Sequence, residues 1–174
     1  MDLKQLMAIA PGVSKPGVFI QLLNKYMPEY GINGKLRQSA FIAQILHETG
    51  SFRWLHELAS GKAYDTGRLA IKLGNTPQKD GDGEKYKGRG CIMITGRANY
   101  LKYGMLMGID LIKFPNKLEE PENAVWSACI YWNEMNLNVY ADKGDMKTIT
   151  KRINGGLNGY DDRMKFYKRA MEVL

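Results

Sequence analysis

The sequence has 174 residues, of which 44% are hydrophobic and 25% are charged. This composition is typical of one globular domain with a substantial core, and two cysteines are too few for a disulfide framework. Lys and Arg number 25 against 18 Asp and Glu, so the formal net charge is +7. Such a charge favours an acidic partner, either nucleic acid, an anionic membrane surface or an anionic cell wall, without choosing among them.

The N-terminal segment carries Asp2 and Lys4 and lacks an apolar run long enough for a secretion signal. No stretch approaches the roughly 20 apolar residues of a membrane span. Cys91 and Cys129 lie in apolar surroundings, so we expect buried, reduced thiols. These features predict synthesis in a cytoplasm, no stable membrane insertion and a fold that does not depend on oxidation.

Helical periodicity dominates the chain, with Pro16 and Pro121 in first turns, Asp145 as an N-cap, and Gly50 and Gly155 at helix ends. The predicted helices are 2–9, 16–27, 34–49, 97–107, 121–135, 145–153 and 161–173.

Glycines and turn signals crowd the segment from 50 to about 96, which predicts a long irregular stretch with a small hairpin near 85–95. Long loops in compact domains are usually functional. We therefore expect one catalytic domain, residues 1–174, of the α+β class and mainly α-helical. A small Gly-rich lobe at about 50–96 would form the second of two lobes, with a central cleft for a ligand.

Glu48 is the first candidate for chemistry because it lies at the C-terminal end of the predicted 34–49 helix. The helix dipole presents partial negative charge there, so we expect a raised pKa for this carboxyl group. A raised pKa suits an acid that protonates a leaving oxygen near neutral pH. A surface glutamate at a fraying helix end is the alternative, and position alone leaves it open.

Glu57 follows nine residues later, in a predicted loop or short helix. Two glutamates separated by a turn can flank a glycosidic bond as acid and base. Glu84 is the rival for the second carboxylate. Nearby aromatic side chains could stack on sugar rings, although core packing is their commoner role; they are Phe52, Trp54 and Tyr64.

His47 and His56 each precede one of these glutamates, which raises the alternative of a zinc site. Ser51 stands where a His-Glu-x-x-His motif needs its second histidine, and the chain has no further His. We therefore interpret the histidines as hydrogen-bonding groups that hold the two carboxylates in place.

Two other motifs fail on inspection. Residues 80–84 begin like a calcium loop, but lack the glycine and the glutamate that such a loop requires further on. Residues 88–90 (GRG) are not followed by the Gly-Lys-Ser/Thr of a phosphate-binding loop.

Several longer segments in order, covering roughly residues 36–174, resemble glycoside hydrolase family 19, and within it the short bacteriophage-type endolysins. The matching segments are 40–50 (AFIAQILHETG), 73–76 (LGNT), 86–90 (YKGRG), 95–100 (TGRANY), 153–159 (INGGLNG) and 162–163 (DR).

The resemblance implies a lysozyme-like fold and an inverting mechanism without cofactor or metal, in which Glu48 is the general acid and Glu57 the general base. Thr95 would help to hold the attacking water. The positions that would bind sugar or hold the second carboxylate are Asn99, Asn154 and Arg163. Two positions depart from the family pattern: Met93 replaces a usual glutamine, and Glu84 a common aromatic residue.

The sequence thus predicts a monomeric endolysin that hydrolyses the β-1,4 bonds of peptidoglycan glycan strands for host cell lysis. It would be made in the host cytoplasm and would act on the wall after release. A chitinase is the alternative enzyme, since the chemistry and the acetamido sugar are shared. A non-enzymatic module that binds the wall or nucleic acid fits the charge, but a polyanion binder has no use for glutamates in its groove. We therefore expect no nucleic-acid partner.

Overall fold

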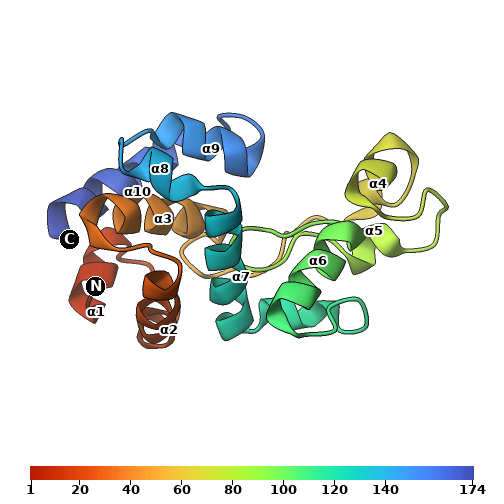
Figure 1. Ribbon diagram of the computed structural model, residues 1–174, viewed down its shortest axis with the longest axis horizontal. Helices are drawn as coiled ribbons and strands as arrows, with labels where there is room; N and C mark the ends of the chain where they lie inside the picture. Colours follow the sequence, from red (N-terminus) through yellow and green to blue (C-terminus); the bar gives the residue numbers. More distant parts are fainter. The chain divides into compact units, whose positions relative to one another are not determined.

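The computed structural model describes all 174 residues, and its regular elements are all helical (Figure 1). They are α1 (Leu3–Ile9), α2 (Pro16–Glu29), α3 (Gly34–Glu48), η1 (Lys62–Tyr64), α4 (Gly67–Leu73), α5 (Asp82–Lys85), α6 (Arg97–Met107), η2 (Pro115–Glu119), α7 (Pro121–Glu134), α8 (Leu137–Ala141), α9 (Met146–Asn154) and α10 (Tyr160–Val173). The mainly helical fold class is confirmed.

All seven predicted helices are present, with ends within two residues of those expected. The cap at Asp145 is confirmed, because its side chain accepts a hydrogen bond from the Thr148 amide, and Gly155 ends α9 in the left-handed conformation. None of the helices combines the length and the apolar character that crossing a bilayer requires.

The Gly-rich segment, predicted to be irregular apart from a small hairpin, is more helical than expected. It contains α4, α5 and η1, and the expected hairpin is reduced to isolated bridges that pair Arg89 with His56 and with Ile94. Helices α5 and η1 have only four and three residues, too few for an apolar periodicity to appear in the sequence.

The chain forms two compact units, Met1–Arg53 with Ala128–Leu174 (unit 1) and Trp54–Ser127 (unit 2). The Gly-rich segment falls mostly in unit 2, which continues to Ser127.

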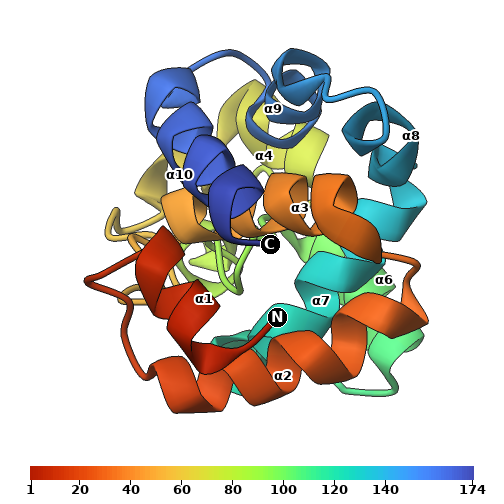
Figure 2. The same cartoon turned by 90° about the vertical axis from the view of Figure 1, so that its left-hand side faces the viewer.

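Unit 1 is organised around α3, which packs mainly against α10 (Figure 2). Every residue from Ser39 to Leu46 is buried, so this helix has no exposed face along two turns. Phe41 is fully buried and meets the Trp132 ring edge to face, with 5.3 Å between ring centroids. Helix α3 therefore provides a rigid support for the residue at its C-terminal end, Glu48.

Unit 2 gathers α4, α5 and α6 around the short paired segments at residues 55–57, 88–90 and 94 (Figure 1). Arg89 lies in the middle of this pairing, since its backbone bridges His56 on one side and Ile94 on the other. Buried Tyr86 and Tyr100 pack edge to face at 5.3 Å beside it. The Cys91 thiol is also buried in this unit.

We expect Phe41→Ala to lower the free energy of unfolding by about 3–5 kcal/mol, because it leaves a cavity against Trp132 in the core of unit 1. Urea denaturation followed by circular dichroism measures the change. Phe114→Ala is the control, because that ring is 50% exposed and should cost much less. Equal losses of unfolding free energy in the two variants would contradict the role of α3 as the core helix of unit 1.

Candidate functional site

Glu48 is held from two sides within unit 1. The Arg163 guanidinium donates one hydrogen bond to Glu48 Oε1 at 2.5 Å and another to Gln44 Oε1 at 2.6 Å. The Gln44 amide donates in turn to the Thr150 hydroxyl at 3.2 Å. Gln44 and Glu48 are four residues apart, so they share one face of α3. Arg163 is 1% exposed and the Glu48 side chain 16%, so the pair is fixed yet the carboxylate reaches solvent.

The turn after Glu48 is unusual because Gly50, Ser51 and Phe52 all have positive φ, from 56° to 63°. Non-glycine residues adopt this conformation at a cost. Thr49 offsets it, because its hydroxyl donates to Ile45 O at 2.6 Å and accepts from the Phe52 amide at 2.8 Å. Phe52 then stacks on Phe19 with 4.0 Å between ring centroids. The turn fixes the end of α3 and the carboxylate on it.

Tyr131 also lies near Glu48 within unit 1. Burial, and then the charge of Glu48, raise the pKa of its hydroxyl above the ordinary value. Its hydroxyl donates to Arg152 O at 2.9 Å, so it stays a neutral donor at working pH.

Glu57 is held in unit 2 through one of its two oxygens. Its Oε2 accepts from the Tyr64 hydroxyl at 3.1 Å and from the Gly88 amide at 3.2 Å. The Glu57 amide donates to Gly88 O at 2.9 Å, which ties the two backbones together. Oε1 is buried and has no hydrogen-bond partner in the protein. The carboxylate is thus oriented with one acceptor oxygen left over.

The contact with Glu57 also changes the pKa of the Tyr64 hydroxyl. Partial burial, followed by the charge of Glu57 and the hydrogen bond to it, raises the pKa of Tyr64. The tyrosine therefore remains a donor to Glu57 well above neutral pH.

Thr95 lies close to the same glycine. A Cβ at Gly88 would lie 2.9 Å from Glu57 Oε2 and 3.2 Å from Thr95 Oγ1, so both oxygens face the Gly88 Cα. The Thr95 hydroxyl donates to Met93 O at 2.8 Å. Because its only hydrogen is used, its oxygen can act towards a third group only as an acceptor.

Charged residues that do not contact Glu57 hold the 88–90 segment of unit 2 in place. Arg89 donates to Glu119 Oε1 at 2.7 Å and to the Tyr100 hydroxyl at 2.9 Å, and the other Glu119 oxygen contacts His56 Nδ1 at 2.9 Å. Burial alone would lower the pKa of Arg89, but its bonds to Tyr100 and Glu119 raise it. The cation therefore stays charged and fixes the 88–90 segment that carries Gly88.

The expectation that the histidines hold Glu48 and Glu57 is wrong. His47 pairs with Asp162 at 2.7 Å, and His56 pairs with Glu119. A histidine that precedes a glutamate in the sequence need not contact it, because adjacent side chains point in different directions on a helix or an extended segment. No group of three or more His, Cys, Asp or Glu residues could hold a metal ion.

The remaining predicted site residues make no hydrogen bond to the carboxylate of Glu48 or Glu57. Asn99 is exposed on α6, where its side-chain amide donates to Thr95 O at 2.7 Å, and Asn154 is exposed at the last residue of α9. Met93 adopts a positive φ of 53° in the turn before Thr95. Glu84 is exposed on α5.

The aromatic residues near Glu57 have three different roles. Phe52 is a core residue, Trp54 is 44% exposed, and Tyr64 binds Glu57 directly. Sequence reasoning had considered all three only for stacking on sugars or for packing.

Several residues of these clusters were missed in the sequence. Gln44 could have been found from its spacing of four to Glu48 on one helix. Gly88 and Arg89 were considered only as part of a nucleotide motif and of a segment that resembles the family, without a role of their own. The contact of Arg89 with Glu119 joins residues 30 apart, which no local pattern reveals.

Comparison with known proteins adds to this geometry. No family model matches the chain. A Haemophilus influenzae protein described as containing a glycosyl hydrolase family 19 domain is 32% identical, over 89% of this chain and 88% of its own length. The chain belongs to glycoside hydrolase family 19. It is therefore a glycoside hydrolase that acts on glycan polymers.

Plant relatives and solved structures agree with the family. An endochitinase of Arabidopsis thaliana is 34% identical over 84% of this family 19 chain, which spans only 49% of the plant protein. The crystal structure of chitinase C from Streptomyces griseus HUT6037 has a TM-score of 0.74 at 20% identity, covering 99% of this chain and 75% of the other. A class IV chitinase from Zea mays has a TM-score of 0.67 at 23% identity, over 95% and 83%. These structures share the fold.

We expect Gly88→Ala to lower kcat by about 10–100-fold, because the new methyl group displaces the carboxylate of Glu57, the candidate general base. Small displacements of a catalytic group are costly. The backbone of Gly88 does not have a positive φ, so the variant should fold. Reducing-end release from chitin oligomers measures the rate. Gly17→Ala, which meets no atom within 4 Å, should keep full activity. Wild-type activity in Gly88→Ala would show that the position of Glu57 does not matter.

Proposed function

We propose that the protein hydrolyses β-1,4 glycosidic bonds by inversion, with Glu48 as general acid and Glu57 as general base. The observation that carries this proposal is the state of Glu57. One oxygen is fixed by Tyr64 and Gly88, while the other is buried and has no partner. A buried acceptor without a donor is costly unless a ligand or water satisfies it.

The groups around Glu57 provide hydrogen-bond acceptors for a nucleophilic water. It would donate one hydrogen to Glu57 Oε1 and the other to Thr95 Oγ1, which can only accept because it already donates to Met93. With both hydrogens engaged, a lone pair of the water is left to attack the anomeric carbon. Glu57 takes the proton as the bond forms.

Glu48 would supply the proton to the leaving oxygen. Arg163 fixes Oε1, so the proton is carried on the other oxygen, Oε2. The rigid α3 and the Thr49 turn hold this group in one orientation. Inverting enzymes place two carboxyl groups on opposite sides of the bond, about 6.5–9.5 Å apart, so that water fits between base and sugar.

We propose peptidoglycan as the polymer and host cell lysis, after release from the cytoplasm, as the role. The net charge of +7 favours an anionic wall. The bacterial relative matches this chain over 88% of its length, whereas the match covers only 49% of the Arabidopsis thaliana endochitinase. Chitin is the second candidate, and it is favoured by the chitinases among the sequence and fold relatives.

We expect Glu48→Gln and Glu57→Gln each to lower the rate by about 10²–10⁴-fold, because each removes one proton-transfer step. Reducing ends released from purified peptidoglycan and from chitin oligomers are measured for both variants. Glu172→Gln, at an exposed position on α10, is the control and should keep wild-type activity. A larger loss in Glu84→Gln than in Glu57→Gln would move the base to Glu84. If the wild type released reducing ends from chitin oligomers and none from peptidoglycan, chitin would replace peptidoglycan as the proposed substrate.

The stereochemistry of the product tests the mechanism itself. Inversion at a β-linkage gives the α-anomer first, and we expect proton NMR of freshly cleaved oligomers to detect it before mutarotation. Initial appearance of the β-anomer would mean a covalent intermediate, and Glu57 would then be a nucleophile and not a base.

A further inference from the structure

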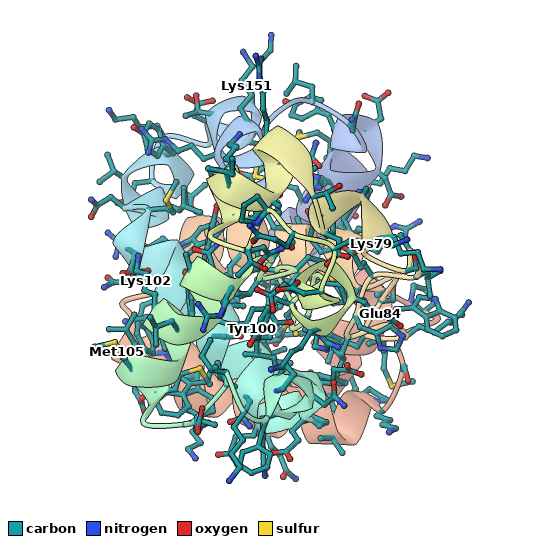
Figure 3. All side chains as sticks on the ribbon, turned by 90° about the vertical axis from the view of Figure 1, so that its right-hand side faces the viewer. Lys79, Glu84, Tyr100, Lys102, Met105 and Lys151 are labelled. Atoms are coloured by element: carbon teal, nitrogen blue, oxygen red, sulfur yellow. The ribbon has the colours of Figure 1, made fainter.

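A pocket of about 620 Å³ lies within unit 2, apart from the contacts of Glu57 described above. It is lined by Lys62, Asp65, Thr66, Lys79, Gly81 and Glu84. Figure 3 shows Lys79 and Glu84 extending on the same side of this unit. The volume is in the range of pockets that hold small organic ligands. We call this the stem pocket.

The walls of the stem pocket are fixed by buried contacts. Asp65 Oδ1 accepts hydrogen bonds from the amides of Gly81 and Gly83, both at 3.0 Å. Gly83 is packed so closely that a Cβ there would lie 2.6 Å from both Asp65 N and Gly61 O. Because Asp65 Oδ1 accepts from both amides, it holds the backbone of residues 81–83 in place, and the pocket is formed without a ligand.

The chemistry of the lining selects the ligand. Lys62 and Lys79 present exposed ammonium groups, Glu84 presents an exposed carboxylate, and Thr66 adds a hydroxyl. Such a site is complementary to a molecule that carries carboxylates and an amino group together. Chitin carries neither. The peptide stems of peptidoglycan carry both, and they are attached to alternate sugars of the strand.

The stem pocket is joined to Glu57 by one short segment. Lys62 and Asp65 line the pocket, and Tyr64 between them donates to Glu57 Oε2. The pocket lining and Glu57 are therefore connected through residues 62–65. We propose that this pocket binds the peptide stem of the glycan strand, with Lys62 and Lys79 pairing with stem carboxylates and Glu84 with a stem amino group. This inference rests on the proposed peptidoglycan activity.

The test compares three substrates: uncrosslinked glycan strands with stems, the same strands after the stems have been removed by an amidase, and chitin oligomers. The test variant is Lys62→Ala with Lys79→Ala. The control is Lys4→Ala with Lys72→Ala, two exposed lysines outside the pocket, which gives the same change in net charge. The value of kcat/KM is measured for each enzyme on each substrate.

We expect the pocket variant to lose about five- to tenfold in kcat/KM on stem-bearing strands, in line with two exposed ion pairs, and to match the wild type on stripped strands and chitin. The control should match the wild type on all three. Glu84→Gln should reduce activity on stems with free amino groups and have no effect once those groups are acetylated.

Two results would contradict the inference, and they differ. If the wild type cleaves stem-bearing and stripped strands and the pocket variant keeps the wild-type ratio between them, the stem pocket is refuted while the proposed function stands. If the wild type cleaves chitin but neither kind of strand, the peptidoglycan activity fails, and the stem pocket with it.

Discussion

The candidate site in unit 2 depends on how the two oxygens of a partly buried carboxylate, that of Glu57, are hydrogen-bonded. Tyr64 and Gly88 both donate to Oε2, and Oε1 is enclosed without a donor. A carboxylate satisfied on both sides would be a structural acceptor with little capacity left for a water. The asymmetry leaves one carboxylate oxygen without a donor from the protein, and the close approach of Glu57 to Gly88 leaves no room for a side chain at position 88.

The rest of unit 2 keeps that geometry in place. The buried Arg89 is the central residue, because its guanidinium joins Glu119 and Tyr100 while its backbone pairs with His56 and Ile94. A buried cation needs this number of partners, since burial without them would be strongly unfavourable. In unit 1 the buried Arg163 has the same role towards Gln44 and Glu48. Each candidate catalytic glutamate therefore has a buried arginine within its own unit.

Much of the fold could be predicted from the sequence, and the site only in part. Seven helices followed from periodicity and caps, because a helix that packs on a core leaves a repeating apolar pattern in the sequence and turn or cap residues at its ends. Glu48 followed from its place at the end of α3. The partners of the carboxylates could not be derived, because Arg163 lies 115 residues from Glu48, and Gly88 lies 31 residues from Glu57. The histidines were misassigned for the same reason: their partners, Asp162 and Glu119, lie far along the chain.

The two thiols have a consequence for the environments in which the enzyme can work. Cys91 and Cys129 are both buried thiols outside any disulfide, and burial raises the pKa of Cys91, which keeps it in the unreactive protonated form. Neither sulfur is presented to an oxidant, and no crosslink has to form or break. The covalent structure is therefore the same in reducing and in oxidising surroundings, so a passage from one to the other would leave the active fold unchanged.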